Sequence, residues 1–99
     1  MYIDTMADGA GFDWDPANTE HVARHRVTPD EVEQAFANGE TGIDYDVVGG
    51  EERWTVIGQT DQSRVLIVVF TMRGEMVRTV TAYEASERMR AEYFATIGT

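Results

Sequence analysis

The hydrophobic positions of this chain are densest between residues 52 and 83, where three apolar segments alternate with two polar, turn-like ones. The apolar segments are 54–59, 65–71 and 76–82. Residues 65–70 form an unbroken apolar run rich in β-branched side chains, and a strand carries such a run when both of its faces are covered. The pattern therefore predicts an antiparallel meander over residues 53–82 with 65–70 as its central strand.

Start signals predict two helices before the meander. Asp15 and Thr28 each stand immediately before a proline, and in this arrangement the first side chain caps the helix while the proline occupies its first turn. Glu31, three residues after Thr28, completes a capping box. We expect helices over about 16–24 and 29–38.

The other segments carry weaker patterns. Apolar residues alternate over 43–47, which predicts a short edge strand entering the meander, and helical spacing over 85–94 predicts a final helix. Residues 1–11 show no sustained period and are expected to form a flexible extension, which leaves 12–99 as one domain. The expected fold class is α+β, with two N-terminal helices, a three- to four-stranded antiparallel meander and a C-terminal helix.

Composition limits the chemistry. The chain has 99 residues and no cysteine, which excludes a disulfide framework and a thiolate zinc site. No segment approaches the length of apolar sequence that spans a bilayer, so we expect a cytoplasmic protein without a membrane partner. The net charge is −10 and would repel nucleic acid as a whole. Its distribution is uneven, because residues 1–52 hold 13 acidic residues against two arginines and residues 53–99 hold five against six. The second half is thus able to present a positive face, and the acidic half to face a basic partner.

Arginines at or near the ends of the predicted strands are the first candidates for function: Arg53, Arg64, Arg73 and Arg78. An arginine held on a rigid sheet is suited to binding an anion through its planar fork of donors. The alternative is ordinary surface pairing with some of the 18 acidic residues, which contributes little to stability.

His25 is a candidate for proton transfer, because an imidazole changes its charge near neutral pH. The alternative is that His25 caps carbonyls at the end of the first helix. His21 lies four residues earlier on the same helical face, but a two-histidine metal site lacks a third clustered ligand in this sequence. Trp14 and Trp54 are suited either to stacking on bases or to packing in a small core.

Short motifs occur in a characteristic order over about residues 12–93. They are Phe12-Asp13-Trp14-Asp15-Pro16 with Asn18, Arg24-His25 before Val27, Glu33 to Phe36, Glu52-Arg53-Trp54 with Ile57-Gly58, the segment 64–70, and Ala85-Ser86 with Arg88, Arg90 and Tyr93. The ordered set resembles the BrnT ribonuclease toxins of bacterial type II toxin–antitoxin pairs. The resemblance implies a RelE-like fold, RNA cleavage without a metal or other cofactor, and neutralisation by a small antitoxin called BrnA.

Cleavage of RNA without a metal requires two proton transfers and fixed positive charge for the transition state. Under the resemblance, the residues expected to supply these are His25, Arg53, Arg64, Arg78 and Tyr83. Arginines expected to bind RNA around them are Arg73, Arg88 and Arg90. A homodimer and a hetero-oligomer with the antitoxin are both compatible with the sequence.

The chain departs from the family pattern at four positions. Tyr83 stands where members carry an arginine at the end of the last strand, and Arg26 replaces the glycine after the motif histidine. Glu87 and Met89 differ from the residues that are usual in the last helix. A tyrosine is able to transfer a proton or stack on a base, but it does not neutralise a phosphate, and its ring would alternatively pack under the last helix. A second hypothesis is therefore a non-catalytic relative that acts as a partner-binding module.

Overall fold

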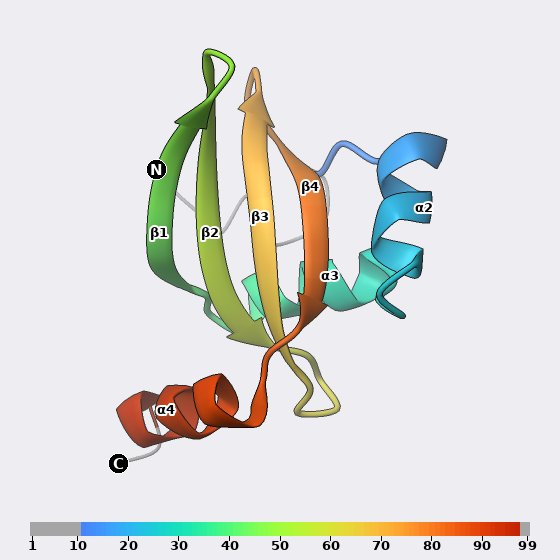
Figure 1. The fold of residues 1–99 in the computed structure, drawn as a ribbon. Coiled ribbons are helices and arrows are strands. Elements are labelled where there is room, and N and C mark those ends of the chain that lie inside the picture. The colour runs from blue at the N-terminus through green and yellow to red at the C-terminus, as the bar shows by residue number, and fades with distance from the viewer. Residues whose placement is uncertain (1–10, 98–99) are drawn as a thin grey trace.

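The structure, a computed structural model, describes residues 11–97. Its elements are α2 (Pro16–Ala23), α3 (Pro29–Ala37), β1 (Thr41–Val48), β2 (Glu51–Gln59), β3 (Val65–Arg73), β4 (Met76–Glu84) and α4 (Glu87–Ile97). The strands form one antiparallel sheet in the order β1-β2-β3-β4 (Figure 1). The predicted α+β meander is confirmed, and the predicted extension over 1–11 lies, apart from Gly11, outside the described residues.

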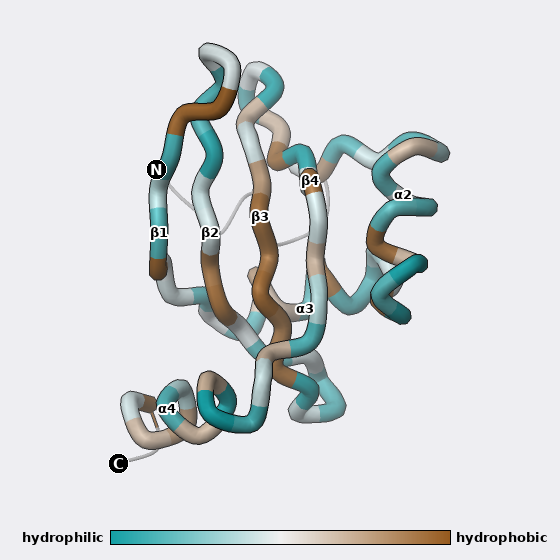
Figure 2. Tube along the Cα trace, in the orientation of Figure 1, coloured by the Kyte–Doolittle hydropathy of each residue, from teal (hydrophilic) through white to brown (hydrophobic). Residues whose placement is uncertain are grey.

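β3 is buried on both faces, as its apolar run predicts. Leu66 and Val68 belong to the larger core cluster, which also includes residues of α2 and α3. Val65 and Ile67 alternate with them and contact Tyr93 of α4 in a second cluster on the other face. Figure 2 shows the hydrophobic colour concentrated along the middle of β3. The period-2 alternation of a strand thus explains how one segment supplies both cores.

The three helices between residues 11 and 97 occupy different places around the sheet (Figure 1). α3 crosses one face and contacts β2 and β3, while α2 packs against β4. The approach of α3 is close because Gly58 of β2 has no side chain: a Cβ there would lie 2.7 Å from the carbonyl oxygen of Ala35. α4 lies at the end of the sheet where β2 finishes and β3 begins.

The capping boxes at the two N-terminal helices are present. The Asp15 carboxylate accepts the Asn18 N–H at 3.1 Å, and the Asn18 side chain accepts the Asp15 N–H at 2.9 Å. Thr28 and Glu31 make the same reciprocal pair at the start of α3. These local contacts explain why the two starts were predictable from sequence.

The end of α2 contains one departure from the family pattern, Arg26. Val27 donates to the Val22 carbonyl and Arg26 donates to the Ala23 carbonyl, which is the hydrogen-bond pair of a Schellman motif. Arg26 has a φ of 61°, the left-handed conformation that glycine adopts most easily. Arg26 therefore occupies a position whose backbone favours the glycine usual there.

Two elements differ from the predicted ranges. α4 begins at Glu87, not at residue 85, because the Ser86 hydroxyl caps it by accepting the Met89 N–H at 3.2 Å. β1 is longer than the predicted short strand, since its pairing with β2 extends from Thr41 to Val48 with one shift of register between Gly42 and Asp44. All eight of its residues are exposed.

The two tryptophans pack in the structure. Trp14 lies against the larger core cluster and donates its indole N–H to Glu33 at 2.9 Å. Trp54 stacks on Phe70, with ring centroids 5.7 Å apart. Both rings are half-buried, so these contacts favour packing over base stacking.

Candidate functional site: an arginine pocket beside two histidines

A polar pocket of about 250 Å³ opens between α2 and the three strands β2, β3 and β4. Its lining residues are Ala17, Asn18, His21, Glu51, Arg53, Thr71, Arg73, Arg78, Thr79 and Val80. We call it the arginine pocket, after Arg53, Arg73 and Arg78. Three of the sequence-predicted arginines thus meet at one place, together with a histidine that the sequence reasoning considered only as a metal ligand.

The register of the sheet brings these arginines together. Thr71 of β3 lies directly opposite Arg78 of β4, so the two side chains share a face. Arg73 lies two residues further along β3 on that same face, because side chains alternate along a strand. Along its other edge β3 pairs with β2, where Phe70 lies opposite Trp54. Arg53, the residue before Trp54, therefore lies opposite Thr71. A shift of register in β4 near Val80, typical of a β-bulge, adjoins the pocket.

Arg78 is held at the N-terminal end of α2. Its Nη2 lies 3.0 Å from the Asp15 carboxylate and its Nη1 lies 3.5 Å from Asp13, and the arginine side chain is 16% exposed. The Asn18 N–H lowers the pKa of Asp15 below its usual value, and the charge of Arg78 lowers it further. The helix cap and the arginine therefore share one carboxylate, which fixes Arg78 relative to α2.

Arg53 and Arg73 are held more loosely. Both contact Glu51, with Arg53 Nε 3.2 Å from Oε1 and Arg73 Nη2 3.9 Å from Oε2. Within residues 11–97, Arg53 donates only through Nε, so its two terminal amino groups have no protein partner there. The Arg73 side chain is 56% exposed. These two guanidinium groups retain donors for an anion that enters the pocket.

The imidazoles lie on the α2 side of the pocket. His21 lines the pocket itself, and the ring of His25 follows one helical turn later with its centroid 6.0 Å from that of His21. The ring of Tyr83 lies beyond, 6.1 Å from His25, and is not part of the apolar cluster under α4. Among residues 11–97 the structure gives the ring of His25 no hydrogen bond to a helix carbonyl, and no third metal-binding side chain joins the two histidines.

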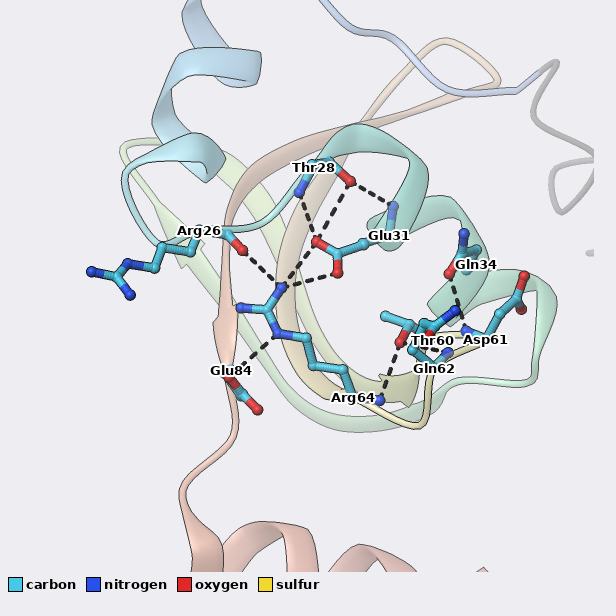
Figure 3. A network of polar contacts seen from close by, with 9 residues as sticks. All are labelled: Arg26, Thr28, Glu31, Gln34, Thr60, Asp61, Gln62, Arg64 and Glu84. Atoms are coloured by element: carbon cyan, nitrogen blue, oxygen red, sulfur yellow. Dashed lines mark hydrogen bonds and ion pairs between the residues drawn. The ribbon is translucent and has the colours of Figure 1, made fainter.

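Arg64 lies outside the pocket, in a network of its own (Figure 3). Its Nη1 contacts both carboxylate oxygens of Glu31 at 2.9 and 3.0 Å and the Arg26 carbonyl at 2.7 Å, and its Nε contacts Glu84 at 3.3 Å. Burial lowers the pKa of Arg64, but the hydrogen bonds and charges of Glu31 and Glu84 more than offset that, so the net shift is upward. Arg64 therefore joins the start of β3 to α3, to the end of β4 and to the loop that carries His25.

The arginines of α4 are also apart from the pocket. Arg88 pairs with Glu92 at 3.4 Å on an exposed helix face, and Arg90 donates to the Ser63 carbonyl at 3.3 Å while its guanidinium lies 5.0 Å from the centre of the Phe94 ring. α4 packs where β2 ends and β3 begins, whereas Arg53 and Arg73 lie at the opposite ends of those strands. The structure thus divides the predicted site residues among three places.

Sequence reasoning missed His21 as a member of the site, although its spacing from His25 was a usable signal. No spacing in the sequence indicated which carboxylates hold the arginines. They belong to Glu51, Asp13 and Asp15. Asp13 lies 65 residues from Arg78, and the two are brought together by the bridge between Phe12 and Val77, in which the Asp13 N–H donates to the Val77 carbonyl at 2.9 Å.

The fold and the site define a small α+β domain that presents clustered arginines beside two imidazoles. The model of a protein family described as the ribonuclease toxin BrnT of type II toxin–antitoxin systems matches residues 14–88, and the chain belongs to this family. No curated protein matches the chain. None of the helices between residues 11 and 97 is long and apolar enough to cross a membrane.

Proposed function

We propose that this toxin cleaves RNA at the arginine pocket, without a metal ion, by attack of a ribose 2′-hydroxyl on the adjacent phosphate. The observation that carries the proposal is the meeting of Arg53, Arg73 and Arg78 from three strands beside His21, with His25 one turn away. Fixed guanidinium groups stabilise the charge that develops on the phosphate, and imidazoles transfer protons at neutral pH.

The roles follow from the surroundings of each residue. Arg53 and Arg73, whose guanidinium groups retain open donors, bind the phosphate oxygens. Arg78, fixed by Asp13 and Asp15, sets the positive charge at the edge next to α2. One imidazole removes the 2′-hydroxyl proton and the other protonates the leaving 5′-oxygen, so the products are a 2′,3′-cyclic phosphate and a 5′-hydroxyl. Tyr83 lies beside His25 and serves as a platform for that ring or for a base.

Arg64 is a positioning residue in this proposal. Its contact with the Arg26 carbonyl fixes the backbone that directly follows His25. Since both carboxylate oxygens of Glu31 and one of Glu84 already engage its guanidinium, Arg64 has fewer donors left for a phosphate than Arg53.

The cell supplies two partners in the proposal. The RNA substrate reaches a pocket lined by three arginines and one glutamate, and an antitoxin of the BrnA kind holds the activity in check. We place both in the cytoplasm. A hetero-oligomer with the antitoxin and a homodimer are the assemblies to distinguish.

One observation favours the non-catalytic alternative. Every arginine of the pocket already contacts a carboxylate, Arg53 and Arg73 through Glu51 and Arg78 through Asp13 and Asp15. A phosphate has to compete with these carboxylates. If it fails, the pocket is a structural feature and the chain acts only through its partner.

The test is incubation of the purified chain with RNA in the presence of a chelator, followed by analysis of the new ends. We expect cleavage that the chelator does not reduce, with 2′,3′-cyclic phosphate and 5′-hydroxyl ends. Cleavage abolished by the chelator would overturn the metal-free mechanism. Intact RNA under all conditions would leave the partner-binding alternative.

A further inference from the structure

The open edge of β1 carries most of the exposed large apolar residues between residues 11 and 97, and the proposed function does not use it. β1 is the outer strand of the sheet, and all eight of its residues are exposed. Four of them are large and apolar, with exposed fractions of 45–51%: Ile43, Tyr45, Val47 and Val48. An exposed apolar edge strand is a template for the addition of another strand, and proteins that do not use it normally block it.

The backbone of this edge is closed by its own acidic side chains. The two-residue turn at Gly49 and Gly50, with φ values of 59° and 83°, makes Val48 and Glu51 a hydrogen-bonded pair, so Tyr45 and Val47 direct their backbone groups away from β2. In the structure the Tyr45 N–H donates to the Asp44 carboxylate at 2.8 Å, and the Val47 N–H donates to the Asp46 carboxylate at 2.7 Å. A new strand must therefore displace two carboxylates.

Charge decides which strand is able to do this. A second copy of β1 would bring Asp44 and Asp46 close to the same residues of its partner, and like charges across a strand pair are unfavourable. A neutral strand would leave both carboxylates without a partner. A strand with arginine or lysine side chains draws the carboxylates onto its own cations, and its carbonyls then accept the released N–H groups. The net charge of −10 attracts such a segment over a distance.

We propose that the β1 edge is the docking site for an extended, basic segment of a partner protein, which adds to the sheet beside β1. An apolar groove of about 180 Å³ continues from this edge, since Ile43 lines it together with Met89 and Tyr93 of α4. The groove receives an apolar side chain of the same segment. Docking thus combines backbone pairing, two ion pairs and one apolar anchor.

The position of the edge connects docking to the arginine pocket. Asp46 pairs with Arg53 across the β1–β2 ladder, and Val48 pairs with Glu51, so the bound segment ends beside two residues of the pocket. A partner at the β1 edge is placed to cover the pocket from that side. This control of the pocket rests on the proposed function, whereas the docking itself does not.

The probe is a synthetic peptide of alternating arginine and valine with the length of β1, eight residues. Its control is the same peptide with every backbone amide methylated, which keeps the charge and prevents strand pairing through either edge of the peptide. Binding to the full chain is measured by titration calorimetry and by amide NMR shifts, without RNA. We expect the unmodified peptide to bind at least about tenfold more tightly than the methylated one, because only it completes the ladder. The largest shifts are expected at residues 41–48.

Two double variants distinguish binding at the β1 edge from general electrostatic attraction to the acidic chain. Asp44→Lys with Asp46→Lys should weaken binding by at least about tenfold, because it replaces two attractions with repulsion. Glu20→Lys with Asp30→Lys changes the net charge equally on exposed helical positions and should weaken it by less than about threefold.

The proposal is overturned if both double variants lose affinity equally, if the methylated peptide binds as well, or if the shifts lie outside the edge. Self-association of the chain through β1 in sedimentation would also overturn it, since a second copy would then be the occupant. The comparison of the two peptides uses the natural chain and does not depend on how the variants fold. Failure of RNA cleavage would leave these binding results unaffected.

Discussion

Arginine side chains have different roles in two regions of this molecule. In the Arg64 network an arginine whose side chain is 22% exposed binds two carboxylates and a backbone carbonyl (Figure 3). In the arginine pocket Arg53 is 32% exposed and contacts a carboxylate through a single nitrogen. The two arginines are the same residue type and both stand near a strand end, so what distinguishes Arg64 from Arg53 is the number of donors already engaged by protein partners.

The largest effect is expected on RNA cleavage at the pocket. Arg53→Gln should lower kcat by on the order of 10² to 10³, because it removes a charged donor to the transition state. The melting temperature should hardly change, since the pair with Glu51 is partly exposed. The matched control is Arg88→Gln, which removes an equally charged side chain from an exposed helix face. Equal losses of activity in both variants would assign the effect to general charge.

Arg64→Ala should show the opposite pattern. It leaves Glu31 and the Arg26 carbonyl without their shared partner, and a hydrogen bond to a charged group is worth about 1.5–3 kcal/mol, so we expect a loss of about 2 kcal/mol in the free energy of unfolding. Urea titration measures it. Arg88→Ala, which breaks only an exposed pair with Glu92, should cost less than about 0.5 kcal/mol. A stable Arg64→Ala protein with lost activity would instead make Arg64 a ligand of the phosphate.

Arg26→Gly should stabilise the same network. The backbone of Arg26 is left-handed, with φ at 61°, and its contribution to the network is its carbonyl, while the side chain points away (Figure 3). Relief of the strain outweighs the added freedom of glycine in the unfolded chain, and we expect a gain of about 0.5–1 kcal/mol in thermal or urea unfolding. Ala23→Gly, at a helical position, is the control and should destabilise. A loss of stability in Arg26→Gly would mean that the arginine side chain matters more than its backbone.

The smallest effect concerns the pH dependence of the link between Arg78 and α2. Hydrogen bonding to Asn18 and the charge of Arg78 lower the pKa of Asp15 in the folded state below its ordinary value of 3.8. The stabilisation is therefore present above that value and is lost as the pH falls through the lower, folded-state pKa. Asp15→Asn keeps a capping residue but loses the charge, so its stability deficit should shrink toward zero in acid. A deficit that stays constant down to about pH 2 would contradict the ion pair.

The sequence predicted what short-range contacts determine. Thr28 and Glu31 are three residues apart, and the apolar run of β3 lies within one segment, so their structures follow from neighbours. The strand-end positions of the arginines were also predictable. Their division between a network and a pocket was not, because it depends on partners such as Glu31, which is 33 residues from Arg64. Such pairs are set by strand register and helix docking.

The measurement that tests the central claim most directly follows the arginine Nε–H signals by NMR while a ribonucleoside 3′-monophosphate is added. The account predicts that the signals of Arg53 and Arg73 move and saturate together with the imidazole signals of His21, whereas the Arg64 signal does not move. A shift of the Arg64 signal without a shift of the signals of the arginine pocket would reverse the assignment of the two regions. No movement at any of these residues would contradict the claim that the pocket binds a phosphate.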